Sequence, residues 1–217
     1  MLNDNKPECS RFNNCNSYSL IGCNGCGFRH FEKIMNASPG NKDIEFLADR
    51  FFILCSEQRR GPGGRVALDK PIKELILTRI PALQEIPSRE LKVKLNCGTN
   101  QIDFKIKCEG GFYANQKYFL YEVKGYGDNT NDILSAITAA QLMREVPKFK
   151  DAFYYYIGIS SGTRNNKHGL TRDAFFDSKR YKVSPYTIWA EKKELLKFYG
   201  ILSIESLLQE IKTKVSS

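Results

Sequence analysis

The chain has 217 residues, of which 41% are hydrophobic, enough to bury one full core but not a second large domain. Its net charge of +9 suits a polyanionic partner such as nucleic acid, although an ordinary solvated surface would also explain it. No apolar run approaches the ~20 residues that cross a bilayer, and the first residues lack the apolar run of a signal peptide. We therefore expect a cytoplasmic protein with no membrane contact.

The first 36 residues form a cysteine-rich segment with little apolar periodicity. Four of the chain's seven cysteines lie there, with the spacing C-x5-C-x7-C-x2-C: Cys9, Cys15, Cys23 and Cys26. An odd total of cysteines in a reducing compartment argues against a disulfide framework. Four thiolates satisfy a tetrahedral Zn²⁺ site, and such a site can fold a segment that has no core. We expect structural zinc in residues 1–36.

Two alternatives to this zinc site remain open. His30 could replace Cys9 as the fourth ligand, or the four thiols could be free. The other three cysteines lie in apolar patterns and are predicted to be small hydrophobic residues: Cys55, Cys97 and Cys108.

Hydrophobic periodicity predicts the elements that follow. Residues 43–58 carry apolar side chains at i, i+3, i+4 and i+7, which indicates a helix that ends at the glycine-rich residues 61–64. Residues 73–80 form a short apolar run that could be a helix or a strand. Residues 101–108 and 117–124 each alternate apolar and polar side chains, and a turn at 109–111 would join them as a hairpin or as neighbouring strands.

The second half of the chain adds a helix and a strand. Residues 131–146 read as a helix that Thr130 or Asn131 caps, and residues 153–159 as a buried strand. Beyond them we expect, in order, a polar loop, a short strand and a helical tail broken near Gly200: residues 160–182, 186–190 and 191–214. Residues 37–217 should thus form an α/β (α+β) domain with a central mixed sheet flanked by helices.

Acidic and basic side chains meet on the two predicted strands. Glu122 and Lys124 are two residues apart, so both project from one face of a strand. Asp103 lies on the polar face of the preceding strand, and antiparallel pairing could bring it beside Glu122. Hard Mg²⁺ takes oxygen ligands, which the two carboxylates and the carbonyl of Val123 would supply for phosphodiester hydrolysis. The lysine would orient and help deprotonate the attacking water, or stabilise the charge of the pentacovalent phosphate. An exposed ion pair between Glu122 and Lys124 is the bland alternative.

Asp103, with Glu122-Val123-Lys124 after it, resembles the motif of the PD-(D/E)xK nuclease superfamily, over residues 43–160. Ile102 stands where the motif has proline. The resemblance implies a Mg²⁺-dependent nuclease with a restriction-endonuclease-like fold. Many members add an acidic residue from an upstream helix, and Glu45 is our candidate for it. Glu57 and Asp49 are the alternatives.

Two basic segments are candidates for contacts to DNA, since arginine and asparagine suit base edges and lysine suits phosphate. Ordinary solvated loops are the alternative for both. The candidates are Arg59, Arg60, Arg65, Arg164, Asn165, Asn166, Lys167, His168 and Arg172.

A compact basic chain with this motif and no nucleotide-binding loop predicts a type II restriction endonuclease that cuts double-stranded DNA at a specific sequence. Palindromic sites would require a homodimer. A repair, junction-resolving or transposon-end nuclease is the alternative of the same chemistry. A catalytically inactive, zinc-containing nucleic-acid-binding protein is the alternative of a different class.

Overall fold

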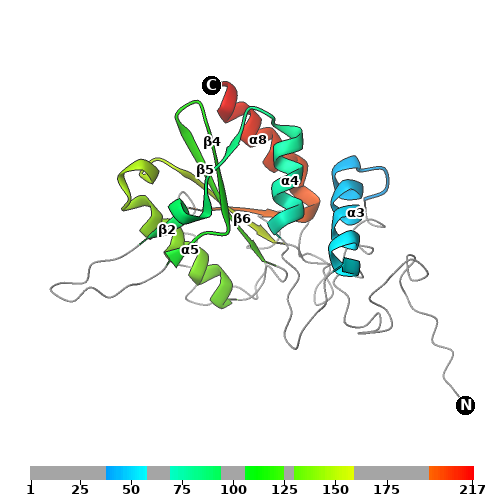
Figure 1. Ribbon diagram of the computed structural model, residues 1–217, viewed down its shortest axis with the longest axis horizontal. Coiled ribbons are helices and arrows are strands. Elements are labelled where there is room, and N and C mark those ends of the chain that lie inside the picture. The colour runs from blue at the N-terminus through cyan, green and yellow to red at the C-terminus, as the bar shows by residue number, and fades with distance from the viewer. Residues whose placement is uncertain (1–37, 58–68, 94–105, 125–129, 159–195) are drawn as a thin grey trace, which may run out of the picture. The chain divides into compact units, whose positions relative to one another are not determined.

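The computed structural model describes residues 38–57, 69–93, 106–124, 130–158 and 196–217 (Figure 1). The chain divides into two compact units, Met1–Leu75 and Ile76–Ser217. The boundary expected near residue 36 lies outside the described residues. No helix in the described ranges is both long and apolar enough to cross a bilayer.

The first unit contains helix α3 (Lys42–Glu57) and the first part of helix α4 (Asp69–Arg79). The side chain of Asn41 caps α3, because its Oδ1 accepts hydrogen bonds from the backbone N–H groups of Asp43 and Ile44, both at 3.1 Å. The apolar side chains of α3 recur at helical spacing and are buried: Ile44, Leu47, Ala48 and Phe51. The predicted helix over 43–58 is confirmed, and the apolar run at 73–80 is mostly helical.

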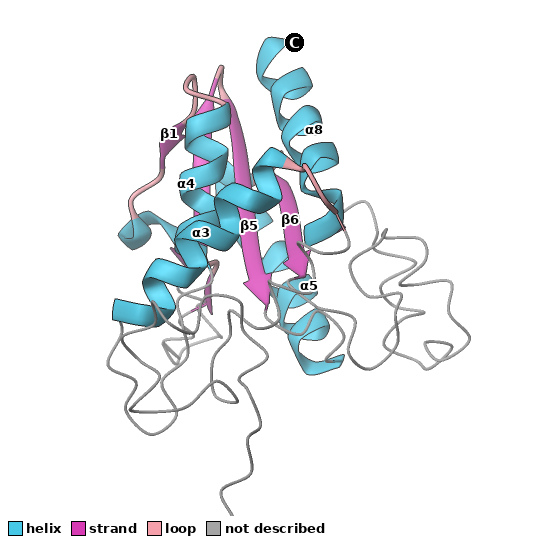
Figure 2. Cartoon of the chain, turned by 90° about the vertical axis from the view of Figure 1, so that its right-hand side faces the viewer, coloured by secondary structure: helices cyan, strands magenta, loops and turns pink. Residues whose placement is uncertain are grey.

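The second unit contains a mixed five-stranded sheet, so the expected α+β class is confirmed. Its strands lie in the order β1-β4-β5-β6-β7, with the bounds Gln84–Glu85, Gly110–Ala114, Lys117–Lys124, Phe153–Gly158 and Lys197–Gly200. Pairing is antiparallel from β1 to β5 and parallel from β5 to β7. Figure 2 shows β5 and β6 side by side, pointing the same way. A separate two-stranded sheet pairs β2 (Lys92–Val93) with β3 (Ile106–Lys107).

Helices α5 (Thr130–Arg144) and α8 (Ile204–Ser216) cover opposite faces of this sheet. Buried residues of α5 share one hydrophobic cluster with Leu120, Tyr154 and Tyr156. The next residue along β6, Tyr155, points to the other face and reaches α8. The described part of the unit also contains three short 3₁₀ helices, η3 (Ser88–Leu91), η4 (Pro147–Phe149) and η6 (Ile201–Ser203). The predicted helix over 131–146 and the buried strand over 153–159 are therefore confirmed.

The hairpin that ends in β5 differs from the expected one. The predicted turn at 109–111 is wrong, because Gly110 and Gly111 lie inside β4 and pair with Tyr121 and Leu120 of β5. A Cβ on Gly110 would lie 2.1 Å from the Tyr121 ring, so glycine is there to admit that ring. The actual turn is Asn115-Gln116, with φ of 47° and 62°, as a two-residue hairpin turn requires.

The C-terminal region also departs from the prediction. Residues 191–214 were expected to be helical on both sides of Gly200, but Lys197–Gly200 forms β7 and only the part after Ser203 is α-helical. The short segment gains its strand conformation from parallel pairing with β6, which no local pattern reveals. Residues 191–195, like the loop over 160–182 and the strand over 186–190, lie outside the described residues.

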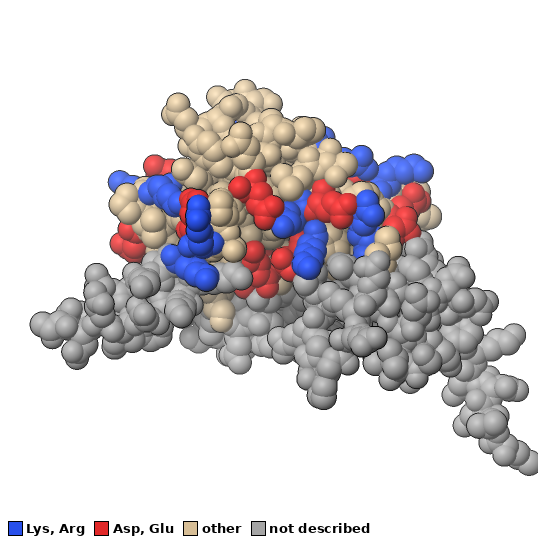
Figure 3. All heavy atoms as spheres, viewed as in Figure 1, with Lys and Arg blue, Asp and Glu red and all other residues tan. Residues whose placement is uncertain are grey.

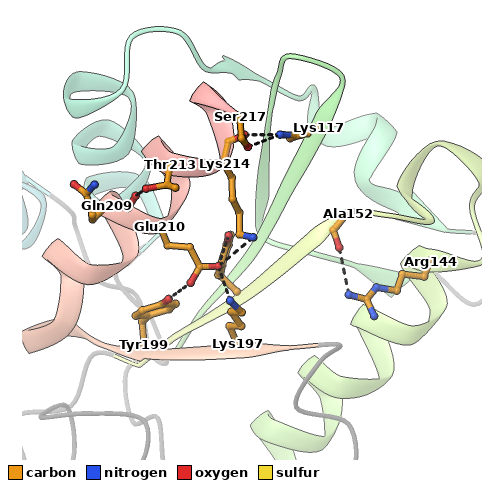
Figure 4. Close-up of polar contacts among 11 residues, drawn as sticks. Lys117, Arg144, Ala152, Lys197, Tyr199, Gln209, Glu210, Thr213, Lys214 and Ser217 are labelled. Atoms are coloured by element: carbon orange, nitrogen blue, oxygen red, sulfur yellow. Dashed lines mark hydrogen bonds and ion pairs between the residues drawn. The ribbon is translucent and has the colours of Figure 1, made fainter.

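A partly buried carboxylate joins α8 to the parallel side of the sheet (Figure 4). Glu210 of α8 is 17% exposed and accepts hydrogen bonds from Lys197 Nζ at 2.9 Å, Tyr155 Oη at 3.2 Å and the hydroxyl of Tyr199. Burial alone would raise the pKa of Glu210, but the contacts with Lys197, Tyr199 and Tyr155 outweigh it and hold that pKa below its usual value.

The end of α8 is held by the β4–β5 hairpin. Asn115 Nδ2 donates to the carbonyl of Val215 at 2.5 Å, and Lys117 Nζ donates to the carbonyl of Lys214 and to Ser217 Oγ, both at 2.8 Å. The last carbonyls of a helix lack partners within the helix, and a lysine there also suits the helix dipole. The hairpin therefore acts as a C-terminal cap for α8.

Replacing Glu210 with glutamine should destabilise the protein by about 1–2 kcal/mol at neutral pH, because a charged acceptor of three hydrogen bonds is lost. The folded-state pKa of Glu210 is lowered, so its contribution is present above the ordinary value of 4.5 and is lost as the pH falls below it. Urea unfolding at neutral and acidic pH should show a difference between wild type and Glu210→Gln that shrinks in acid. Glu205→Gln, an exposed change on the same helix, is the control and should show a smaller difference at neutral pH.

Replacing Gly110 with alanine should cost about 1–3 kcal/mol, because the new methyl group displaces the buried Tyr121 ring, which stacks on Phe112 at 5.4 Å. In a Tyr121→Leu background, the shorter side chain leaves room and the cost of Gly110→Ala should fall. Thermal unfolding of the four chains of this double-mutant cycle measures the coupling. An equal cost in both backgrounds would contradict this explanation for the glycine.

Candidate functional site

Glu122 lies near the end of β5, the central strand of the sheet. Its side chain is only 8% exposed, and among the described residues it is the one buried charged side chain. Its register partner on β6 is Tyr156, and Leu120 and Tyr154 form the preceding pair on the same face. Burying a carboxylate is costly unless it is hydrogen-bonded, paired or bound to a metal ion. This position is therefore the first candidate for a functional side chain.

Glu109 is the residue opposite Glu122 when the β4–β5 pairing is continued by one position. The backbone N–H of Glu109 donates to Glu122 Oε2 at 3.3 Å, and the N–H of Val123 donates to Glu109 Oε2 at 2.5 Å. Each carboxylate thus accepts from the backbone of the opposite chain segment. This reciprocal arrangement brings two carboxylates together at the open end of the hairpin.

Tyr154, on β6, faces the same side of the sheet as Glu122 and is 3% exposed. Its hydroxyl is fully buried and has no hydrogen-bond partner among the described residues. Burial raises the pKa of Tyr154 well above its usual range, and the charges of Cys108, Glu122 and Glu109 act in the same direction. Tyr154 faces this side because its register partner is Leu120, two residues before Glu122 on β5. An unsatisfied buried hydroxyl costs about 1–3 kcal/mol, so it calls for an additional partner.

The other predicted ligands at this site are described only in part. Val123 is 3% exposed and follows Glu122 on β5, and Lys124 is the last residue of that strand, with a side chain outside the described atoms. Asp103 lies outside the described residues. The β4–β5 hairpin places Glu109 opposite Glu122, and the part of Asp103 in the site stays a prediction.

Glu45 was expected to add a carboxylate from the upstream helix. It lies in the first turn of α3, its side chain is 43% exposed, and it forms an ion pair with Lys42 at 3.5 Å. Of the two alternatives, Asp49 is exposed on the same helix, and Glu57 is its last residue. All three belong to the first unit, whereas Glu122 belongs to the second. Their part in the site stays a prediction.

The predicted zinc ligands and DNA contacts all lie outside the described residues. These are Cys9, Cys15, Cys23, Cys26 and the alternative His30, together with Arg59, Arg60, Arg65, Arg164, Asn165, Asn166, Lys167, His168 and Arg172. Within the described ranges, no three His, Cys, Asp or Glu side chains gather as a metal site. On the face shown in Figure 3, the described basic and acidic side chains are interspersed. Cys108 is buried in the hydrophobic cluster, as predicted.

Two residues of the site were missed from the sequence. Glu109 was placed in a turn because two glycines follow it, and Tyr154 was treated only as part of a buried strand. Asn115 was a usable signal, because asparagine favours the positive φ of a two-residue hairpin turn, and a turn at 115–116 pairs Glu109 with Glu122. Nothing local marks Tyr154, whose role depends on parallel pairing.

Comparisons of this chain with family models, curated proteins and solved structures found no match. The functional interpretation therefore depends on the chemistry of its own residues. Two adjacent carboxylates on a rigid strand pair, with a lysine at the end of the same strand, can hold a hard divalent cation and orient a water molecule beside it.

Proposed function

We propose that this chain is a Mg²⁺-dependent endonuclease that hydrolyses phosphodiester bonds of double-stranded DNA at a specific sequence, as type II restriction enzymes do. The observation that carries the proposal is the buried carboxylate of Glu122 near the end of the central strand, with Lys124 two residues further along. Proteins keep buried carboxylates where they are paired or bind a metal ion. The resemblance of Glu122-Val123-Lys124 to the PD-(D/E)xK motif, and the net charge of +9, support the same assignment.

The donor set fits Mg²⁺, because carboxylate and carbonyl oxygens are the ligands that this ion prefers. Glu122 and a second carboxylate would hold it, with the carbonyl of Val123 as a further ligand; from the sequence, the second carboxylate is Asp103. When bound, the ion would neutralise negative charge on the scissile phosphate.

The side chain of Lys124 would act on the attacking water. Lys124 would hold the water by a hydrogen bond and help remove its proton as the new P–O bond forms and the bond to the leaving oxygen breaks. The pairing of β5 on both sides keeps the backbone that carries Glu122 and Lys124 rigid.

Substrate binding would come from the remainder of the chain. We assign DNA contacts to the basic residues of segments 59–65 and 164–172, and a structural Zn²⁺ to the cysteines of residues 1–36. Two copies of the chain would cut the two strands of a palindromic site.

Unmethylated plasmid and phage DNA incubated with Mg²⁺ should give discrete fragments with the wild type. Glu122→Gln and Lys124→Ala should each lower the cleavage rate by about a hundredfold or more, because the ligand for the metal or the group that orients water is lost. Glu205→Gln, an exposed change on α8, is the matched control and should cut like the wild type.

Each other outcome of this assay has a defined meaning. Cleavage that depends on DNA structure rather than sequence would replace the restriction enzyme with a repair or junction-resolving nuclease. DNA binding without cleavage in any divalent metal would overturn the proposal in favour of a binding protein. Unchanged cleavage by Glu122→Gln would remove Glu122 from the site.

A further inference from the structure

The β4–β5 hairpin places Glu109 directly opposite Glu122, in the role that the sequence suggested for Asp103. The two residues face each other across β4 and β5, and the backbone hydrogen bonds from Glu109 to Glu122 and from Val123 to Glu109 fix both carboxylates. Two carboxylates at opposite positions of a hairpin can supply two oxygen ligands to one divalent cation. The arrangement is therefore suited to a divalent cation.

The hydroxyl of Tyr154 is a separate observation that points to a ligand at the same place. It is buried, it has no hydrogen-bond partner in the part of the chain that the structure describes, and it lies on the same face of the sheet as Glu122, opposite Leu120. A tyrosine hydroxyl can donate one hydrogen bond and accept another. A hydrated cation held by the two carboxylates would bring a water molecule that satisfies this hydroxyl.

We propose that Glu109 and Glu122 bind a hard divalent cation such as Mg²⁺ or Mn²⁺ as a pair, and that Tyr154 is a positioning residue that hydrogen-bonds to a water ligand of that cation. The proposal deepens the proposed function, on which it rests for the use of the metal, and it assigns to Glu109 the place that the sequence suggested for Asp103. Mg²⁺ in proteins usually keeps several waters and takes only one or two carboxylates, so two glutamates are sufficient protein ligands.

Glutamine is the suitable replacement at position 109. The side-chain carbonyl of Gln can still accept the hydrogen bond from Val123 N–H, while the negative charge is lost. Phenylalanine at position 154 keeps the buried ring and removes only the hydroxyl. Both changes therefore separate metal binding from folding.

Binding of Mn²⁺ alone to the full chain, followed by calorimetry and by the electron paramagnetic resonance of the free ion, tests the proposal without DNA. Glu109→Gln should weaken binding by about tenfold or more, and Tyr154→Phe by a smaller factor. Asp103→Asn compares the two assignments directly and should weaken binding less than Glu109→Gln does. Glu85→Gln, an exposed change on β1 of the same sheet, is the matched control and should also be unchanged.

Thermal unfolding without metal gives Tyr154 a readout that a purely structural role would not produce. Tyr154→Phe should melt at the wild-type temperature or above it, because an unsatisfied buried hydroxyl is removed, although its affinity for Mn²⁺ falls. A lower melting temperature with unchanged affinity would make Tyr154 merely structural and overturn its assignment.

Three results would overturn the assignment of Glu109: a wild type that binds no Mn²⁺, a Glu109→Gln variant that binds like the wild type, or a loss of binding in Asp103→Asn alone. The outcome is independent of the nuclease proposal. Binding that depends on Glu109 in a chain that cuts no DNA would keep this cation site and reject the nuclease. DNA cleavage that survives Glu109→Gln would keep the nuclease and reject Glu109 as a ligand of its metal ion.

Discussion

The pairing of β5 on both of its edges is the constraint on which the second unit depends. One edge is antiparallel to β4 and the other is parallel to β6. A parallel partner requires a crossover connection, and α5 lies in the chain between the two strands. The same pairing assigns Leu120 and Glu122 to one face of the sheet and Phe119 and Tyr121 to the other. A slip of one residue would exchange the two sets, so the register that builds the core also positions the buried carboxylate.

Elements with strong periodicity were predictable because their own side chains specify them. The apolar positions of α3 recur at helical spacing. The aromatic run Phe153–Gly158 is too short for a buried helix, so it reads as a buried strand. Both were predicted with bounds close to the observed ones. Of the candidate site, Glu122 and its strand were predictable for the same reason, since residues 117–124 alternate cleanly.

The departures arise where tertiary contacts override local preference. Gly110 and Gly111 look like a turn in isolation, but the side chains of Tyr121 and Leu120 occupy the space that a Cβ would need. Asn115-Gln116 lacks the glycine that usually marks a hairpin turn, so the true turn was missed and Glu109 with it. β7 is a strand because β6 lies beside it, and the sequence of four residues cannot reveal that neighbour.

The cap that Asn115 and Lys117 provide for α8 joins residues about 100 positions apart in the chain. Contacts between such distant residues slow folding, because a long loop must close before they form. During synthesis the β4–β5 hairpin leaves the ribosome well before α8 does, so the tip of the hairpin must wait for its partner. The tip of the hairpin should gain its full rigidity only after the residues of α8 have been made, so it is among the last parts of the unit to reach its final structure.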